Sequence, residues 1–179
     1  VSLDQLASGS ADPPGLLLAG IALLLVGFGF KVAAVPFHSW TPDVYQGSPS
    51  PAVVYMASGV KAAGFAGLLR VLLQAFGDEL VDDWQPYVFG LAVATLLVGS
   101  ILAVVQTDVK RLLAYSSISH AGFVLVGVQA ASDRGVSGAL FYLAAYVFMA
   151  AGSFAVVSVV SRTGDDASSL DDFRGLASR

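Results

Sequence analysis

Residues 27–61 read GFGFKVAAVPFHSWTPDVYQGSPSPAVVYMASGVK. Each of two apolar segments in this stretch contains a lysine, Lys31 in the first and Lys61 in the second, and a proline- and glycine-rich sequence separates them. A charge at the centre of a lipid bilayer costs about 2.5–3.5 kcal/mol on insertion scales. Sequences rarely keep such residues for packing alone, so we interpret both lysines as proton-handling groups of a membrane protein.

The composition excludes several other classes of protein. Of the 179 residues, 56% are hydrophobic and 12% are charged, whereas soluble domains have about 25% charged residues. There is no cysteine, which excludes disulfides and thiolate-bound metal or iron–sulfur sites within the chain. The net charge of −4 gives no reason to expect nucleic-acid binding. These features are typical of a polytopic membrane protein.

The apolar runs predict an all-α transmembrane bundle of about five helices. A helix needs about 20 apolar residues to cross a bilayer, and five runs meet this condition: 15–40, 52–73, 87–105, 112–131 and 137–160. A polar loop at 1–14 precedes them and a polar tail at 161–179 follows them. The tail completes no recognisable unit, so we expect the chain to be a fragment of a longer protein.

The first predicted span is interrupted near Lys31. Gly27 and Gly29 weaken the helix, and Pro36 cannot donate a hydrogen bond to the carbonyl of Val32. The sequence therefore predicts a broken helix at Lys31–Pro36. Broken helices at membrane depth line cavities, and transporters place ion sites beside them. An ordinary proline kink is the alternative.

The basic residues predict the orientation in the membrane. With five spans, the connections alternate between two sides. One side has Arg70 and Arg134, and the other has Lys110, Arg111, Arg162, Arg174 and Arg179. By the positive-inside rule the second side is cytoplasmic, so we expect the N-terminal residues outside and the tail in the cytoplasm.

Three ionisable side chains are predicted to lie at one depth. Lys31 precedes Thr41 by ten residues, Lys61 follows Pro51 by ten, and His120 follows Lys110 by ten. At about 1.5 Å per residue each lies about 15 Å from the cytoplasmic face, in the middle of the bilayer core. We predict a lateral proton path through buried Lys31, Lys61 and His120.

A second histidine is predicted beside this path. His38 lies seven residues beyond Lys31, on the same face of the helix if the helix continues. Neutral imidazole both accepts and donates protons, so His38 and His120 are predicted relays. For His120, a hydrogen bond to a neighbouring helix is an equal alternative.

Three segments carry a resemblance to a known family: FKVAAVPFHSWTPDVYQGSPSP, the VK pair ending at Lys61, and DVKRLLAYSSISHAGF. They resemble the antiporter-like membrane subunits of bacterial proton-translocating NADH:quinone oxidoreductase, respiratory complex I, and particularly the subunit N type. The resemblance implies a fold of about fourteen spans, of which this chain would supply roughly the seventh to eleventh. It also implies that Lys31 is a proton-channel residue on a broken helix, that Lys61 lies on the central hydrophilic axis, and that His38 belongs to the same motif.

The same resemblance implies a function and its partners. The chain would translocate protons in the bacterial plasma membrane beside sibling antiporter-like subunits, while NADH, FMN, iron–sulfur clusters and quinone bind to partner subunits. No dinucleotide fingerprint, cofactor site or metal site is recognisable here; GFGF lies in an apolar span. The family's glutamate partner and a later lysine are absent, and Tyr142 and Tyr146 replace histidines of the sibling subunits.

Two alternatives remain open at this point. A sodium/proton antiporter subunit with no redox role would have the same lysines and the same broken helix. A purely structural bundle would pair its lysines with acids on helices outside the chain.

Overall fold

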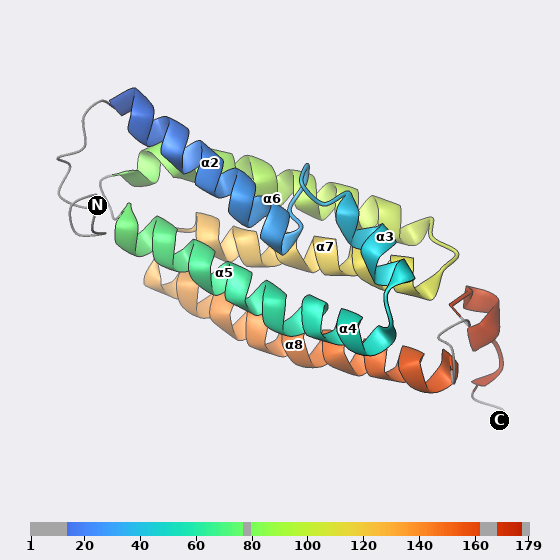
Figure 1. Cartoon of the computed structure of the whole chain (residues 1–179). Coiled ribbons are helices and arrows are strands. Elements are labelled where there is room, and N and C mark those ends of the chain that lie inside the picture. The colour runs from blue at the N-terminus through green and yellow to red at the C-terminus, as the bar shows by residue number, and fades with distance from the viewer. Residues whose placement is uncertain (1–13, 77–79, 162–167, 177–179) are drawn as a thin grey trace.

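The computed structural model describes residues 14–76, 80–161 and 168–176, and these residues form a helical bundle (Figure 1). In these ranges the only extended pairing is an isolated bridge between Asp108 and Ser169. Five helices are long enough and apolar enough to cross a membrane: α2 (Pro14–Val32), the composite helix Ser50–Ala75, α6 (Val81–Val104), α7 (Val109–Gln129) and α8 (Asp133–Ser161). The all-α polytopic architecture predicted from the sequence is therefore confirmed.

The second span is a composite of α-helical and π-helical turns. It consists of α4 (Ser50–Tyr55), the π-helical η1 (Met56–Val60), α5 (Lys61–Arg70) and the π-helical η2 (Val71–Ala75). A π-helical turn widens the helix locally and often marks a functional site. Here η1 ends immediately before Lys61, and nothing in the hydropathy pattern indicated this irregularity.

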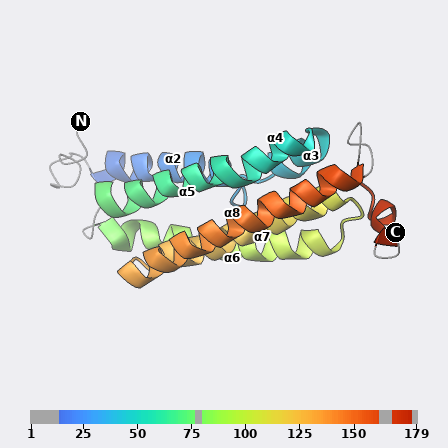
Figure 2. The ribbon, with the colours of Figure 1, turned by 90° about the horizontal axis from the view of Figure 1, so that it is seen from below.

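The helices lie in two groups along a common long axis. Viewed from below, α2 and α4–α5 lie on one side, and α6, α7 and α8 on the other (Figure 2). Within the second group α7 packs against both α6 and α8, and α4 and η1 contact α8. The face of α4–α5 that meets α7 and α8 therefore lies in the interior of the bundle.

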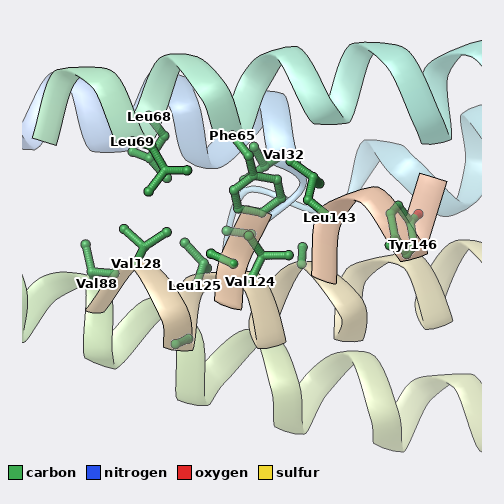
Figure 3. Packing of buried hydrophobic residues seen from close by; sticks show 14 of the residues in the cluster. Val32, Phe65, Leu68, Leu69, Val88, Val124, Leu125, Val128, Leu143 and Tyr146 are labelled. Carbon is green, nitrogen blue, oxygen red and sulfur yellow. The ribbon is translucent and has the colours of Figure 1, made fainter. Parts of the chain in front are cut away.

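Apolar side chains fill the space between these groups. Phe65 of α5 is completely buried and points toward the helices below it, where Val124 and Leu125 of α7 and Leu143 of α8 lie (Figure 3). Close packing of this kind fixes how the helices pack against one another. It places the neighbouring residues of α5, including Lys61, beside α7 and α8.

The first span is broken, and the break begins before Pro36. Helix α2 ends at Val32, so the broken helix predicted at Lys31–Pro36 is confirmed, and the run 15–40 is not a single helix. The N–H of Ala33 donates to the Phe30 carbonyl and that of Ala34 to the Gly29 carbonyl, while Ala33 has a φ of 61°. This is the Schellman arrangement that closes a helix C-terminus, and proline commonly follows it. The helix is therefore ended by its own C-cap, not only by the missing proline N–H.

A short helix follows the break where a connection was expected. Helix α3 (Trp40–Gly47) occupies most of the Thr41–Pro51 stretch, and α4 starts at Ser50. Only Ser48 and Pro49 are extended between the two helices, because Pro49 and Pro51 favour a helix start and not a helix interior. The stretch is thus the short helix α3 followed by one sharp turn into α4.

Tertiary contacts hold the broken segment in place. The N–H of Val35 donates to Thr95 Oγ1 of α6 at 3.0 Å, and Thr95 is completely buried. The Trp40 indole N–H donates to the Phe30 carbonyl at 3.2 Å, which satisfies one carbonyl of the last turn of α2. An added Cβ at Gly29 would lie 2.8 Å from the Phe37 ring, so the segment folds back closely onto α2.

We expect Thr95→Val to destabilise this segment. Valine has nearly the same shape but no acceptor, so the Val35 N–H would lose its partner at a cost of about 1–3 kcal/mol. Hydrogen exchange of the full-length protein should show faster exchange at the Val35 amide, by about tenfold for each 1.4 kcal/mol. Thr95→Ser, which keeps the hydroxyl, is the control and should exchange like the wild type; equal exchange in the valine variant would contradict this role.

One end of the bundle carries a polar network that joins three connections. Arg111 forms an ion pair with Asp43 and donates to Gln46 at 3.1 Å, which links α7 to α3. Asp108 caps α7 by accepting from the Arg111 N–H at 2.9 Å. Lys110 is 2% exposed and donates to the Ser48 carbonyl at 3.2 Å. This lysine is therefore packed inside the protein, whereas a basic residue that only sets the membrane orientation could remain at the surface.

The residues after α8 join the same end. The N–H of Leu170, the first residue of η4 (Leu170–Phe173), donates to the Thr107 carbonyl at 3.0 Å. The turn between α3 and α4, the link before α7 and residues 168–176 therefore share one end, as the alternation of five spans predicts. Residues 1–13 of the loop expected at 1–14, and Arg162 and Arg179 of the tail, lie outside the described residues, and Pro14 begins α2.

Candidate functional site

Lys61 lies in the interior of the bundle. Its side chain is 3% exposed, and its Nζ donates to the Ser117 carbonyl of α7 at 2.9 Å and also to the Ser117 hydroxyl. The Tyr146 ring of α8 lies with its centroid 5.8 Å from Nζ. A buried ammonium requires such partners, because an unpaired one would lose its hydration without replacement.

Ser117 is the shared acceptor at the centre of the site. Its Oγ accepts from Lys61 Nζ and from the Tyr146 hydroxyl, the latter at 2.7 Å. The three residues come from α5, α7 and α8, and Ser117 and Tyr146 are both buried. We call Lys61, Ser117 and Tyr146 the lysine cluster. Figure 3 shows the Tyr146 side chain on α8, at one end of the labelled core residues.

His120 lies one turn farther along α7. Its Nδ1 and the Tyr142 hydroxyl are 2.7 Å apart, and its ring centroid is 5.3 Å from that of Tyr146. The histidine is therefore hydrogen-bonded to the neighbouring helix, as the structural alternative expected, and it also lies next to the lysine cluster. The hydrogen bond to a neighbouring helix and a place beside the predicted proton path are therefore compatible for His120.

Two cavities meet the lysine cluster from different sides. The first has a volume of about 270 Å³, and its lining includes Lys31, Tyr45 and Lys61. The second has a volume of about 80 Å³, and its lining includes Ser117, His120 and Tyr146. Lys61 thus faces the first cavity while its hydrogen-bond partner Ser117 faces the second.

Lys31 lies close to Lys61 but is not buried. In addition to sharing the first cavity, its side-chain Cγ would lie 3.2 Å from a Cβ added at Gly64 of α5. The expectation of a buried Lys31 is wrong for the described residues, in which Lys31 is exposed. Lys31 is the penultimate residue of α2, which packs mainly against α5, and the described helices leave its side chain exposed.

His38 lies apart from the other candidates. A shared face with Lys31 required the helix to continue, and because α2 ends at Val32 this condition is not met. His38 is half-buried, and its Nδ1 has no hydrogen-bond partner within the described ranges. It lines neither of the two cavities.

Sequence reasoning did not distinguish Ser117 from the hydroxyl residues around it, and it missed Tyr45. Ser117 belongs to a run of serines in which nothing distinguishes the one that faces Lys61. Tyr45 lies on α3, which was expected to be a connection, yet it is 1% exposed and packs against Phe154 at a centroid distance of 5.8 Å. The signal that was available is the spacing of Ser117 and His120, which puts both on adjacent turns of one helix face.

Comparison with known proteins identifies the family. The family model described as NADH:quinone oxidoreductase/Mrp antiporter, TM, matches residues 2–179. The chain belongs to this family. The match confirms the resemblance on which the sequence interpretation relied.

Relatives within this family have consistent names. The chain is 49% identical over 179 residues to "NADH-quinone oxidoreductase subunit N 3" of Streptomyces griseus, covering all of this chain and 32% of that protein. It is 51% identical over 175 residues to "NADH-quinone oxidoreductase subunit N" of Mycobacteroides abscessus, covering 96% of this chain and 32% of the relative. The chain therefore spans about a third of the length of the curated relatives it matches.

A solved structure of the same family has the same fold. A chain of respiratory complex I from Thermus thermophilus with bound aureothin matches with a TM-score of 0.71 and 42% identity. The match covers 87% of this chain and 35% of that one. The helical arrangement described above is therefore that of a complex I antiporter-like membrane subunit.

Proposed function

We propose that this chain is part of a proton-translocating, non-redox membrane subunit of NADH:quinone oxidoreductase. The observation that carries the proposal is Lys61, a buried lysine whose ammonium faces one cavity while its partner Ser117 faces another. An ionisable residue at membrane depth that is held between two cavities is suited to passing a proton from one to the other. The subunit N names of the relatives support the same assignment.

Lys31 and Lys61 would act as consecutive proton carriers. Both line the first cavity, so a proton released by one has a short way to the other. Lys31 would exchange protons with an acidic partner on a helix that this chain does not contain, and that helix would cover its exposed side. Protonation of that partner would release Lys31 from its ion pair and raise its tendency to give up a proton.

The histidines would have unequal roles. His120 lies beside the lysine cluster and is bonded to Tyr142, which suits a relay that continues toward α8. His38 would serve as a relay only through groups outside this chain, because it lines neither cavity. Moving one charge against 100 mV costs about 2.3 kcal/mol, so the driving energy must come from redox events elsewhere in the complex.

Partners and location follow from the same proposal. NADH, FMN, iron–sulfur clusters and quinone would bind to other subunits, and sibling antiporter-like subunits would lie beside this one in the bacterial plasma membrane. The end that carries the Arg111 network would face the cytoplasm, with the N-terminal residues on the outside. In this arrangement no step assigned to the chain requires a bound cofactor or metal.

We expect Lys31→Ala in the full-length protein to impair proton pumping. With the complex assembled in membrane vesicles, NADH-driven proton uptake should fall by about tenfold or more, because a positioned proton-transfer group contributes at least that much. Quinone reduction should fall with it if the two are coupled. Arg134→Gln, at an exposed position of α8, is the control and should pump normally.

The outcomes of this experiment separate the possible functions. Unchanged pumping by the Lys31 variant would contradict the role of this lysine. The family model also covers Mrp antiporters, and a cation/proton antiporter with no redox role would be supported if the wild type translocated protons in response to a sodium gradient but not to NADH.

A further inference from the structure

We propose that the Ser117 hydroxyl conducts protons between Lys61 and the cavity of His120, and that Tyr146 is the positioning residue that orients it. This proposal rests on the proposed function and deepens it. The neutral side chain of Ser117 would then connect two ionisable residues, Lys61 and His120. The geometry of the lysine cluster carries it.

A proton path from Lys61 to His120 has to lead from the first cavity to the second. Lys61 lines the first cavity, and Ser117 and Tyr146 line the second together with His120. Ser117 is the residue that touches Lys61 Nζ directly and also faces the second cavity. A proton that leaves Lys61 toward His120 therefore meets Ser117 first.

Ser117 offers Lys61 two acceptors, and only one of them can conduct. The carbonyl oxygen, 2.9 Å from Nζ, accepts a hydrogen bond but has no proton to pass on. The hydroxyl accepts a proton at one lone pair and releases its own. The carbonyl thus anchors the ammonium, and the hydroxyl provides the route.

Tyr146 determines which way the Ser117 hydroxyl points. Its hydroxyl donates to Ser117 Oγ at 2.7 Å, and Lys61 donates to the same oxygen. Both lone pairs of Oγ are then occupied, so its own proton has to point elsewhere. The second cavity, which Ser117 lines together with His120, is one space into which this proton can point, and the Tyr45 hydroxyl is the other neighbouring acceptor.

The second cavity is large enough for the remaining step. Its volume of about 80 Å³ exceeds the roughly 30 Å³ that one water molecule takes in liquid water, and serine, histidine and tyrosine side chains line it. A water there would bridge Ser117 Oγ and the His120 imidazole. The Nδ1 of His120 remains bonded to Tyr142, which holds the ring in place during the transfer.

The step balances in protons and charge. One N–H bond of the Lys61 ammonium breaks as an O–H bond forms at Ser117 Oγ, whose original O–H proton passes to the water. The water passes one of its protons to the imidazole. Lys61 ends neutral and His120 positive, while Ser117 and the water are chemically unchanged; rotation of the Ser117 hydroxyl about its C–O bond then restores its starting orientation.

The test compares Ser117 variants in the full-length protein within the assembled complex. Ser117→Ala keeps the carbonyl anchor but removes the hydroxyl, and NADH-driven pumping should fall by about tenfold or more. Ser117→Thr restores a hydroxyl at the same position and should recover most of the rate. Ser137→Ala, at an exposed position of α8, is the matched control and should pump like the wild type.

Assembly is measured in every variant, so that loss of pumping is not confused with loss of the complex. If Ser117→Ala fails to assemble, Tyr146→Phe provides the second test. It keeps the ring beside Lys61 and removes only the donor to Ser117, so pumping should fall while assembly stays normal. Normal pumping in an assembled Tyr146→Phe complex would then overturn the proposal.

The remaining outcomes are also decisive. Normal pumping by Ser117→Ala overturns the inference, and so does equal loss in the alanine and threonine variants. If Lys61→Met loses pumping in the same assay, the proposed function stands although the inference fails. If Lys61→Met pumps normally, the proposed function itself fails.

Discussion

Replacing Lys61 with methionine in the full-length protein is expected to abolish proton pumping while leaving the complex assembled. Methionine fills nearly the same space but has no ionisable group, so no proton can reside at the junction of the two cavities. Removing a buried charge also removes its desolvation penalty, so stability should not suffer. NADH-driven acidification of inverted vesicles, measured beside the amount of assembled complex, would show the loss.

Lys61→Arg distinguishes proton transfer from mere charge. Arginine keeps the positive charge but is not deprotonated in proteins, so we expect this variant to fail in pumping as the methionine variant does. Arg70→Gln, at an exposed position on the same helix, is the control and should pump normally. Normal pumping by an assembled Lys61→Met complex would instead support a purely structural bundle.

Replacing Gly99 with leucine is expected to prevent the protein from folding stably. A Cβ at Gly99 of α6 would lie only 2.6 Å from the Ser119 backbone nitrogen of α7, and backbone cannot move aside as a flexible side chain can. Likewise, a Cβ added at Gly122 of α7 would lie 2.9 Å from the Leu96 backbone nitrogen of α6. Close contact through small residues is the usual way in which helices associate in lipid.

The expected size of this effect is large. Overpacking costs about 1–3 kcal/mol or more, and separating α6 from α7 also removes the 2.9 Å hydrogen bond between Ser100 and Ser119. We expect about 3 kcal/mol of destabilisation, seen as little full-length protein in the membrane and a lower temperature of complex dissociation. A Cβ added at Gly90 of the same helix meets nothing within 4 Å, so Gly90→Leu should be tolerated. Equal yields of the two variants would contradict the role of this contact.

Much of the fold could be predicted from the sequence because hydropathy acts locally. Each long apolar run becomes a helix, since the backbone has no other way to satisfy its polar groups in lipid. The position of the break was also approximately right, because glycines and a proline near Lys31 weaken the helix. Its form was not predictable: the left-handed Ala33 has no side-chain signal, and the acceptor for the Val35 N–H comes from Thr95, sixty residues away.

The candidate site was only partly predictable for a similar reason. Lys61 and His120 were selected because an ionisable side chain in an apolar run is costly, and the structure brings both to the same region. Lys31 also lies near Lys61, because both line one cavity. The placement of His38 on the same face as Lys31 required a continuous helix, whereas α2 ends at Val32 and the chain folds back. The partners Ser117, Tyr146 and Tyr45 lie on three other helices, whose rotation about their axes is set by packing.

The stretch from Gly27 to Lys61 by itself determined that the protein is a membrane protein with two lysines in apolar helices and a break beside the first. That much follows from the energy of charge in lipid and from the backbone limits of glycine and proline. Only the tertiary structure decided that Lys61 is buried against Ser117 while Lys31 stays exposed at a helix end. The reason is that burial depends on which helices cover a residue, and in a bundle this is settled by close contacts such as that of Gly99 with Ser119, far from the lysines in sequence.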